Sequence, residues 1–215
     1  ALWLAFLISS FIAIFTGLSY AELSSMFETD AGEFDYVENA FNKKYAFIVG
    51  LMMIIAGFVS ASAVALGFAG YFISLISMPL VLAALGLVVL MTLINFKGIK
   101  ESSWFNTVST LIEFSGLVLI IILGLRNFGS VNYFEMPFGI QGVFSAGALV
   151  FFAFMGFESI VKLAEETKDP EKTIPKALIY SVIITTIVYV LVALSAVSLI
   201  GWKELNSSSA PLAVA

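Results

Sequence analysis

The chain has 215 residues, of which 60% are hydrophobic and 12% charged, whereas soluble domains carry about 25% charged residues, so its composition is that of a membrane protein. The net charge of −5 argues against nucleic acid as a partner, because nucleic-acid binding needs a basic surface. Since the chain contains no cysteine and no histidine, it lacks the residues for disulfides, thiol chemistry and the usual zinc sites, and we expect no cofactor and no metal.

Six apolar stretches are long enough to span a bilayer, which takes roughly 20 residues of helix. They cover about residues 1–27, 45–76, 79–96, 103–125, 142–166 and 174–200, and a seventh begins near Ala210. These stretches predict an all-α, polytopic membrane protein with about six transmembrane helices. We expect a single transmembrane domain over residues 1–215. Both ends of the chain lie inside or beside apolar runs, so we also expect a fragment of a longer protein.

Basic residues are distributed unevenly over the segments that join these spans. Eight of the ten lie in or beside segments 28–44, 97–102 and 162–173, whereas Arg126 and Lys203 lie on the other side. Because Lys and Arg accumulate on the cytoplasmic side of membrane proteins, the three segments are predicted to be cytoplasmic. The sequence therefore predicts a multi-pass protein of the cell membrane, with the lipid bilayer as its surroundings.

The segment between the first two spans has its own helical pattern. Phe34, Val37 and Phe41 recur at helical spacing and are surrounded by acidic residues and by Lys43–Lys44. This pattern predicts a short amphipathic helix that lies at the cytoplasmic interface of the membrane.

The second span carries a stripe of small residues at steps of three and four: Ala56, Ser60, Ala63, Gly67 and Gly70. Small residues let helix backbones approach closely in a membrane. Two interpretations stay open at this point. The stripe either packs helices together, or part of it lines a substrate cavity.

Glu113 is an acidic residue near the middle of the fourth span. It lies about ten residues from either end of the span, which places it close to the bilayer midplane. Asn106, Glu113 and Gly116 share one helical face, and we expect this face to point toward protein or a cavity. A functional role is the default hypothesis for an acid at this depth. The alternative is a protonated side chain that hydrogen-bonds neighbouring helices.

The fifth span contains FFAFMGFESIVKLAEE, residues 151–166, in which Gly156 and Glu158 interrupt an apolar run. Glycine is unfavourable inside a helix and permits non-helical torsions. A break at Gly156 would expose backbone carbonyl and amide groups at membrane depth, where they must line a cavity or meet a ligand. In the alternative interpretation, Glu158 forms an ordinary ion pair with Lys162 one turn later.

Three motifs resemble those of a known family. The run FFAFMGFESIVKLAEETKDPEKTIPKAL resembles the sixth transmembrane segment and the following loop of amino acid permeases of the amino acid–polyamine–organocation (APC) superfamily. GLSYAELSSMF with AGEFDYVENAF, and INFKGIKESSWFN, resemble two further parts of these permeases. The resemblance extends over essentially the whole chain, from the second segment of the family to the start of the eighth. It implies that the first helix and the C-terminal helices of the family lie outside this chain.

The resemblance implies a fold of two inverted five-helix repeats, in which the first and sixth helices are broken and hold the substrate between them. By resemblance, the break of the sixth helix corresponds to Met155–Gly156–Phe157. The carbonyl groups freed by this break, around Phe152, Ala153 and Met155, would then receive the α-ammonium group of the substrate.

Further site residues follow from the same resemblance. Phe152 resembles the aromatic residue that packs over bound substrate, and Glu158 resembles the acid just inside the break. Ala61 and Val64 resemble positions that line the pocket for the substrate side chain. Glu113 stands where some proton-coupled members carry a lysine. It is therefore the candidate coupling residue, and proton carriage, a cation site or the absence of a coupling ion all stay open.

The implied function is that of a secondary active transporter that moves amino acids across the membrane by alternating access, with protons as coupling ion (symport) or by exchange (antiport). An enzyme is not expected, because the chain has no histidine or cysteine and no aspartate inside a span. The alternative is a permease-like receptor or scaffold that binds amino acids without transporting them. The side chains of Ala61, Val64 and Phe152 favour an uncharged or apolar substrate.

Overall fold

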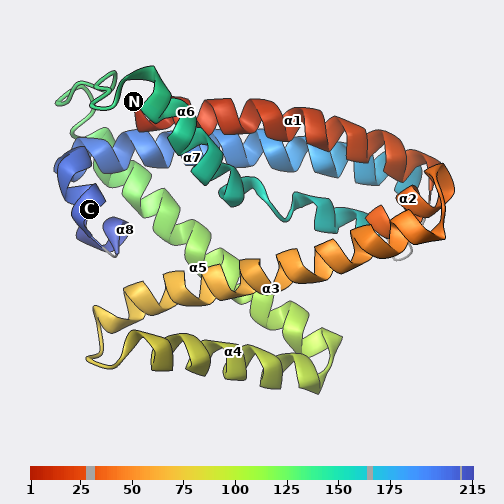
Figure 1. The fold of residues 1–215 in the computed structure, drawn as a ribbon. Coiled ribbons are helices and arrows are strands. Elements are labelled where there is room, and N and C mark those ends of the chain that lie inside the picture. The colour runs from red at the N-terminus through yellow and green to blue at the C-terminus, as the bar shows by residue number, and fades with distance from the viewer. Residues whose placement is uncertain (28–31, 164–166, 209) are drawn as a thin grey trace. The chain divides into compact units, whose positions relative to one another are not determined.

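The computed structural model of the protein describes residues 1–27, 32–163, 167–208 and 210–215, except for the side chains of residues 99–101 and 162. Within these ranges all regular elements are helices (Figure 1). Six candidate membrane spans are formed by α1 (Leu2–Met26), α3 (Lys43–Ile73), α4 (Leu80–Lys97), α5 (Ile99–Leu125), α6 with the segments that continue it (Gly139–Val161), and α7 (Pro170–Ser207). The predicted all-α, polytopic class is therefore confirmed.

The observed helices begin and end within a few residues of the predicted spans. The short helix expected before the second span is α2 (Glu33–Ala40). In α7 the backbone leaves the helical conformation at Gly201, with φ 75° and ψ 159°, next to the predicted end of the span at residue 200. The seventh apolar segment begins with α8 (Pro211–Val214), whose first residue is a proline. Hydrophobic run length thus predicts these elements well.

The contacts of the chain define two compact units. The first unit comprises Ala1–Met53 with Asn132–Leu194, and the second comprises Ile54–Val131 with Ser195–Ala215. Helices α3 and α7 each contribute to both units. The single-domain organisation expected from the sequence stays a prediction.

In the first unit, α1 buries a face made of small residues. Its buried positions, most of them three or four residues apart, are Ala5, Ser9, Ser10, Ala13, Gly17, Ala21 and Ser24. Helix α6 (Gly139–Val150) lies against this face (Figure 1). The hydroxyl of Ser9 donates to the carbonyl oxygen of Gly147 at 2.6 Å, and Gly147 lies against Ile8 and the backbone of Ala5. Small residues thus bring the two backbones close together, as is usual between membrane helices.

In the second unit, α3 packs on α4 through alanines. The buried residues of this contact are Ala65, Ala69, Ala83 and Ala84. Of the stripe predicted on this span, Gly70 is buried, whereas Ala63 and Gly67 are exposed. Helix α3 therefore packs on α4 mainly with the face of Ala65 and Ala69, and not with the predicted stripe of small residues.

The second unit also contains a very close approach between α5 and the last part of α7. A Cβ atom added at Gly124 would lie 2.5 Å from Cα of Ser195. Ser195 is buried, so its backbone cannot easily move away. This helix crossing therefore has no space for a side chain at position 124, and only glycine fits there.

Candidate functional site

The fifth span is broken at Met155–Gly156, where the sequence predicts the break. Helix α6 ends at Val150 and continues as a short 3-10 segment, η1 (Phe151–Phe154), and a second 3-10 segment, η2 (Phe157–Leu163), follows the break. Met155 is extended, with φ −70° and ψ 144°. Gly156 has φ +111°, a conformation that residues with a side chain rarely adopt.

The amide group freed by the break is satisfied by a side chain. In a continuous α-helix the N–H of Gly156 would donate to the carbonyl oxygen of Phe152. It donates instead to Oε2 of Glu158 at 2.7 Å, while the carbonyl oxygen of Phe152 accepts from the N–H of Met155 at 3.1 Å. Glu158 therefore binds the backbone of the break itself. The alternative partner expected from the sequence, Lys162, has a side chain outside the described part of the chain.

The carbonyl group freed by the break is also satisfied by a side chain. In a continuous α-helix the carbonyl oxygen of Ala153 would accept from the N–H of Phe157. Here it accepts from the hydroxyl of Tyr189 on α7, at 2.9 Å. Tyr189 is not among the site residues predicted from the sequence. The available signal was a tyrosine inside an apolar span, whose hydroxyl needs a partner at that depth.

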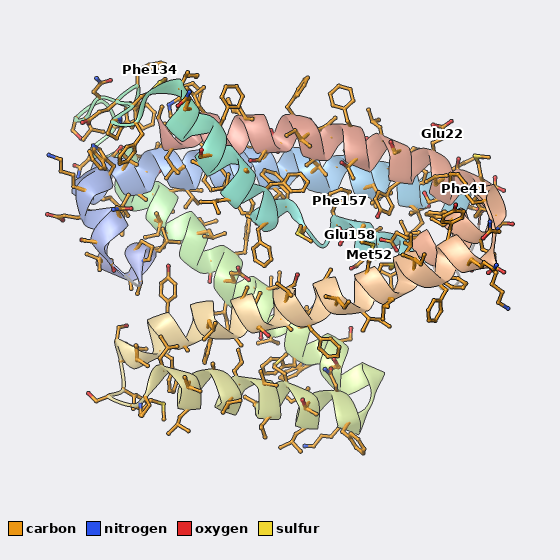
Figure 2. All side chains as sticks on the ribbon, viewed as in Figure 1. Glu22, Phe41, Met52, Phe134, Phe157 and Glu158 are labelled. Atoms are coloured by element: carbon orange, nitrogen blue, oxygen red, sulfur yellow. The ribbon has the colours of Figure 1, made fainter. Side chains whose placement is uncertain are left out.

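One side of the break is open in the described chain. Phe152 is 42% exposed and Met155 is 48% exposed, and Ala153 between them is exposed as well. Phe157 turns inward instead, and its ring lies edge-on to that of Tyr20 on α1, with centroids 6.2 Å apart. Figure 2 shows Phe157 and Glu158 side by side where the ribbon resumes its coil after the break.

Next to Phe157, α2 is attached to α1. The hydroxyl of Tyr20 donates to Oε1 of Glu33 on α2 at 2.8 Å. Around this bond a cluster of buried side chains joins α1, α2, η2 and α7: Ala21, Tyr36, Val161, Ile174 and Leu178. Helix α2, the segment after the break and the first turns of α7 therefore form one packed assembly.

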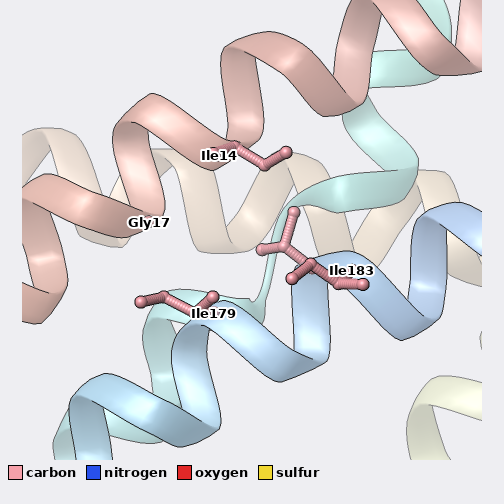
Figure 3. A pocket seen from close by; sticks show the side chains of 5 residues that line it. Ile14, Gly17, Ile179 and Ile183 are labelled. Carbon is pink, nitrogen blue, oxygen red and sulfur yellow. The ribbon is translucent and has the colours of Figure 1, made fainter.

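A small hollow lies between α1 and α7 in the first unit. Ile14 and Gly17 face Ile179, Val182 and Ile183 across it (Figure 3). Its volume is about 40 Å³ and its lining is entirely apolar. Sites for small molecules usually have volumes of about 300 Å³ or more and contain a few polar groups. This hollow is therefore not a candidate site for an amino acid.

The structure brings together six of the residues that the sequence analysis assigned to the site: Phe152, Ala153, Met155, Gly156, Phe157 and Glu158. Ala61 and Val64 lie exposed on α3 and Glu113 lies exposed on α5, all three in the second unit. Their roles stay predictions. Among the described residues, no group of three acidic side chains could hold a metal ion.

Comparison with known proteins gives a consistent result. A family model described as amino acid permease matches residues 1–215. The chain is 33% identical to the branched-chain amino acid permease BcaP of Bacillus subtilis (strain 168), over 89% of this chain and 46% of that protein. It is 29% identical to the methylthioribose transporter of the same organism, over 96% of this chain and 49% of that protein.

A plant relative matches over a similar region. The cationic amino acid transporter 1 of Arabidopsis thaliana is 28% identical, over 100% of this chain and 39% of that protein. The chain thus spans less than half the length of these three relatives.

Proposed function

Because the chain belongs to the amino acid permease family over residues 1–215, we propose that the complete protein is a secondary active transporter that moves amino acids across a cell membrane by alternating access. The family and its relatives are transporters, so the protein is not an enzyme. The observation that carries the proposal is the break at Met155–Gly156 within a membrane span. Many secondary transporters hold their substrates at interrupted helices at membrane depth.

The proposed substrate position is beside the open side of the break. There the carbonyl groups of Phe152, Ala153 and Met155 receive the α-ammonium group, and the ring of Phe152 packs over the substrate. The exposure of these residues and the positive φ of Gly156 support this position. From the resemblance of their positions alone, Ala61 and Val64 are proposed to contact the side chain of the substrate.

We further propose that the substrate has an uncharged, apolar side chain. Among the described residues from Phe152 to Leu163, Glu158 is the one acidic residue, and its carboxylate is already bonded to the amide of Gly156. It is therefore poorly placed to bind a cationic side chain as well. The similarity to a branched-chain amino acid permease supports the same substrate class. Unlabelled leucine should compete with labelled substrate much better than arginine, and stronger competition by arginine would contradict this assignment.

Glu113 is proposed as the coupling residue, and segments 28–44, 97–102 and 162–173 as the cytoplasmic side. The position of Glu113, an acidic residue in the middle of the apolar span α5, supports its role in coupling. The excess of lysine in the three segments supports their cytoplasmic location. In proton-coupled transport, Glu113→Gln should flatten the dependence of uptake on external pH. An unchanged pH dependence would remove Glu113 as proton carrier.

The proposed function is tested with the full-length protein in proteoliposomes. Labelled amino acids outside the vesicles should accumulate inside in a saturable way, and empty vesicles provide the control. Amino acids that bind the protein without crossing the membrane would show instead a permease-like receptor or scaffold.

A further inference from the structure

We infer that Tyr189 is a positioning residue of the substrate site, because its hydroxyl holds the carbonyl group of Ala153 at the helix break. The hydroxyl donates to this oxygen at 2.9 Å, from a position 36 residues later in the chain. The inference rests on the proposed function, since it concerns the group that would receive the substrate's α-ammonium. It adds a residue of α7 to the part of the site that η1, the break and η2 form.

The break deprives the carbonyl of Ala153 of the helical bond that would fix its direction. A carbonyl oxygen can accept two hydrogen bonds, one with each lone pair. Tyr189 uses one of them, so a second remains for a donor on the exposed side of Ala153. An ammonium group has three donors and finds there an oxygen whose direction is already set. Binding then costs less reorganisation than it would at a free carbonyl.

The hydroxyl of Tyr189 is itself held in place by aromatic packing. The ring of Tyr189 lies 5.4 Å from that of Phe6 on α1 and 5.3 Å from that of Phe154 in η1, measured between centroids. Phe154 is buried and belongs to a cluster with Ala13 of α1. These contacts hold the ring, which belongs to α7, against α1 and η1. The position of the Ala153 carbonyl group therefore depends, through Tyr189, on the positions of α7 and α1.

The test is the substitution Tyr189→Phe in the full-length protein. Phenylalanine keeps the ring contacts with Phe6 and Phe154 and removes only the hydroxyl. We expect the KM for the amino acid to rise about three- to tenfold, the usual effect of one hydrogen bond, with the maximal rate close to that of the parent. The matched control is Tyr180→Phe, the same change at an exposed position of the same helix, which should leave KM unchanged.

A second readout separates positioning from a merely structural effect. Carboxylic acids that carry the substrate's side chain but no α-amino group compete for the site without using the Ala153 carbonyl. Their inhibition constant should be the same in the parent and in Tyr189→Phe, while that of the amino acid rises. An equal rise for both compounds would show that the site has only been loosened, and would overturn the inference.

The inference and the proposed function fail in different ways. Absence of uptake by the parent protein contradicts the transport proposal, and the dissociation constant of labelled amino acid on purified protein then replaces KM as the readout for Tyr189→Phe. An unchanged constant in that variant overturns the inference, whatever the parent transports. A lowered constant also overturns it, because Tyr189 would then compete with the substrate for the carbonyl. If the amine-free acid does not bind the parent, the test is the comparison of KM in Tyr189→Phe with KM in Tyr180→Phe. Equal values would overturn the inference.

Discussion

Glu158 and Gly156 form a closed local unit, because a carboxylate oxygen of Glu158 accepts the backbone N–H of Gly156 at 2.7 Å. A backbone amide left without a partner inside a membrane costs several kcal/mol, by general estimates. A carboxylate is a stronger acceptor for it than a neutral group. The first role of Glu158 is therefore to hold the turn at the break.

Two substitutions at Glu158 separate its oxygen from its charge. Glu158→Ala removes the acceptor, leaves the amide of Gly156 without this partner, and should lower the free energy of unfolding by about 1–3 kcal/mol. Glu158→Gln keeps a side-chain oxygen at the same place, so it should lower the free energy of unfolding less than Glu158→Ala does. Thermal unfolding of the purified protein measures both. Glu22→Ala, at an exposed position of α1, is the control, and equal losses for Gln and Ala would contradict this role of Glu158.

Ser9 provides a test of the contact between α1 and α6. It is buried, and its hydroxyl donates to carbonyl oxygens of its own helix and of Gly147. Ser9→Ala should cost about 0.6 kcal/mol of stability, the average for a hydrogen bond between membrane helices. Ser9→Leu should cost much more, because no space exists for its side chain. Ser19→Ala, which removes an exposed hydroxyl bonded within α1, should have no effect.

Gly124 should be intolerant of a side chain. In Gly124→Ala the new methyl group meets the backbone of Ser195, so α5 and α7 must move apart in the second unit. Overpacking of this kind costs about 1–3 kcal/mol. Gly116→Ala on the same helix adds a methyl group in open space and should be neutral or slightly stabilising. Equal melting temperatures for the two variants would show that the helix crossing is looser than described.

Tyr36 on α2 should make stability depend on pH in the alkaline range. Burial, and then the negative charges of Glu33 and Asp35, raise the pKa of Tyr36 to about 12, from an ordinary value of 10. The neutral phenol is thus favoured in the folded state. Its contribution to stability is complete below pH 10 and is lost as the pH rises through about 12.

Tyr36→Phe removes this titration. Among the described residues the buried hydroxyl of Tyr36 has no hydrogen-bond partner, so the variant should be at least as stable as the parent at neutral pH. Its stability should also fall less steeply between pH 10 and 12. Tyr45→Phe, at an exposed position, is the control. Identical alkaline unfolding of Tyr36→Phe and the parent would contradict the assignment.

The spans and the break could be predicted from the sequence because both depend on local composition. A run of apolar residues marks a membrane helix wherever it packs, and Gly156, between Met155 and Phe157, is a local exception to such a run. The amphipathic pattern of Phe34, Val37 and Phe41 likewise marks α2 by itself.

The partners across helices could not be predicted in the same way. Tyr189 is one of several tyrosines in the chain, and only the fold brings its hydroxyl to Ala153. The small residues of α1 recur at the same steps as those of α3, so spacing alone does not tell which stripe makes a close contact. For Glu158, the sequence offered Lys162 as partner, whereas the bond to Gly156 exists only because the helix is broken.

The most direct test of the central claim, that transport depends on the helix break, is amino acid uptake by Gly156→Ala in proteoliposomes. At φ +111° an alanine is strained by about 1–3 kcal/mol, although space for its methyl group exists. The backbone should therefore leave this conformation, move the carbonyl groups away from the substrate, and reduce uptake about tenfold or more. Gly57→Ala, at an open position inside α3, should transport normally. Uptake by Gly156→Ala at the rate of the parent protein would contradict the account.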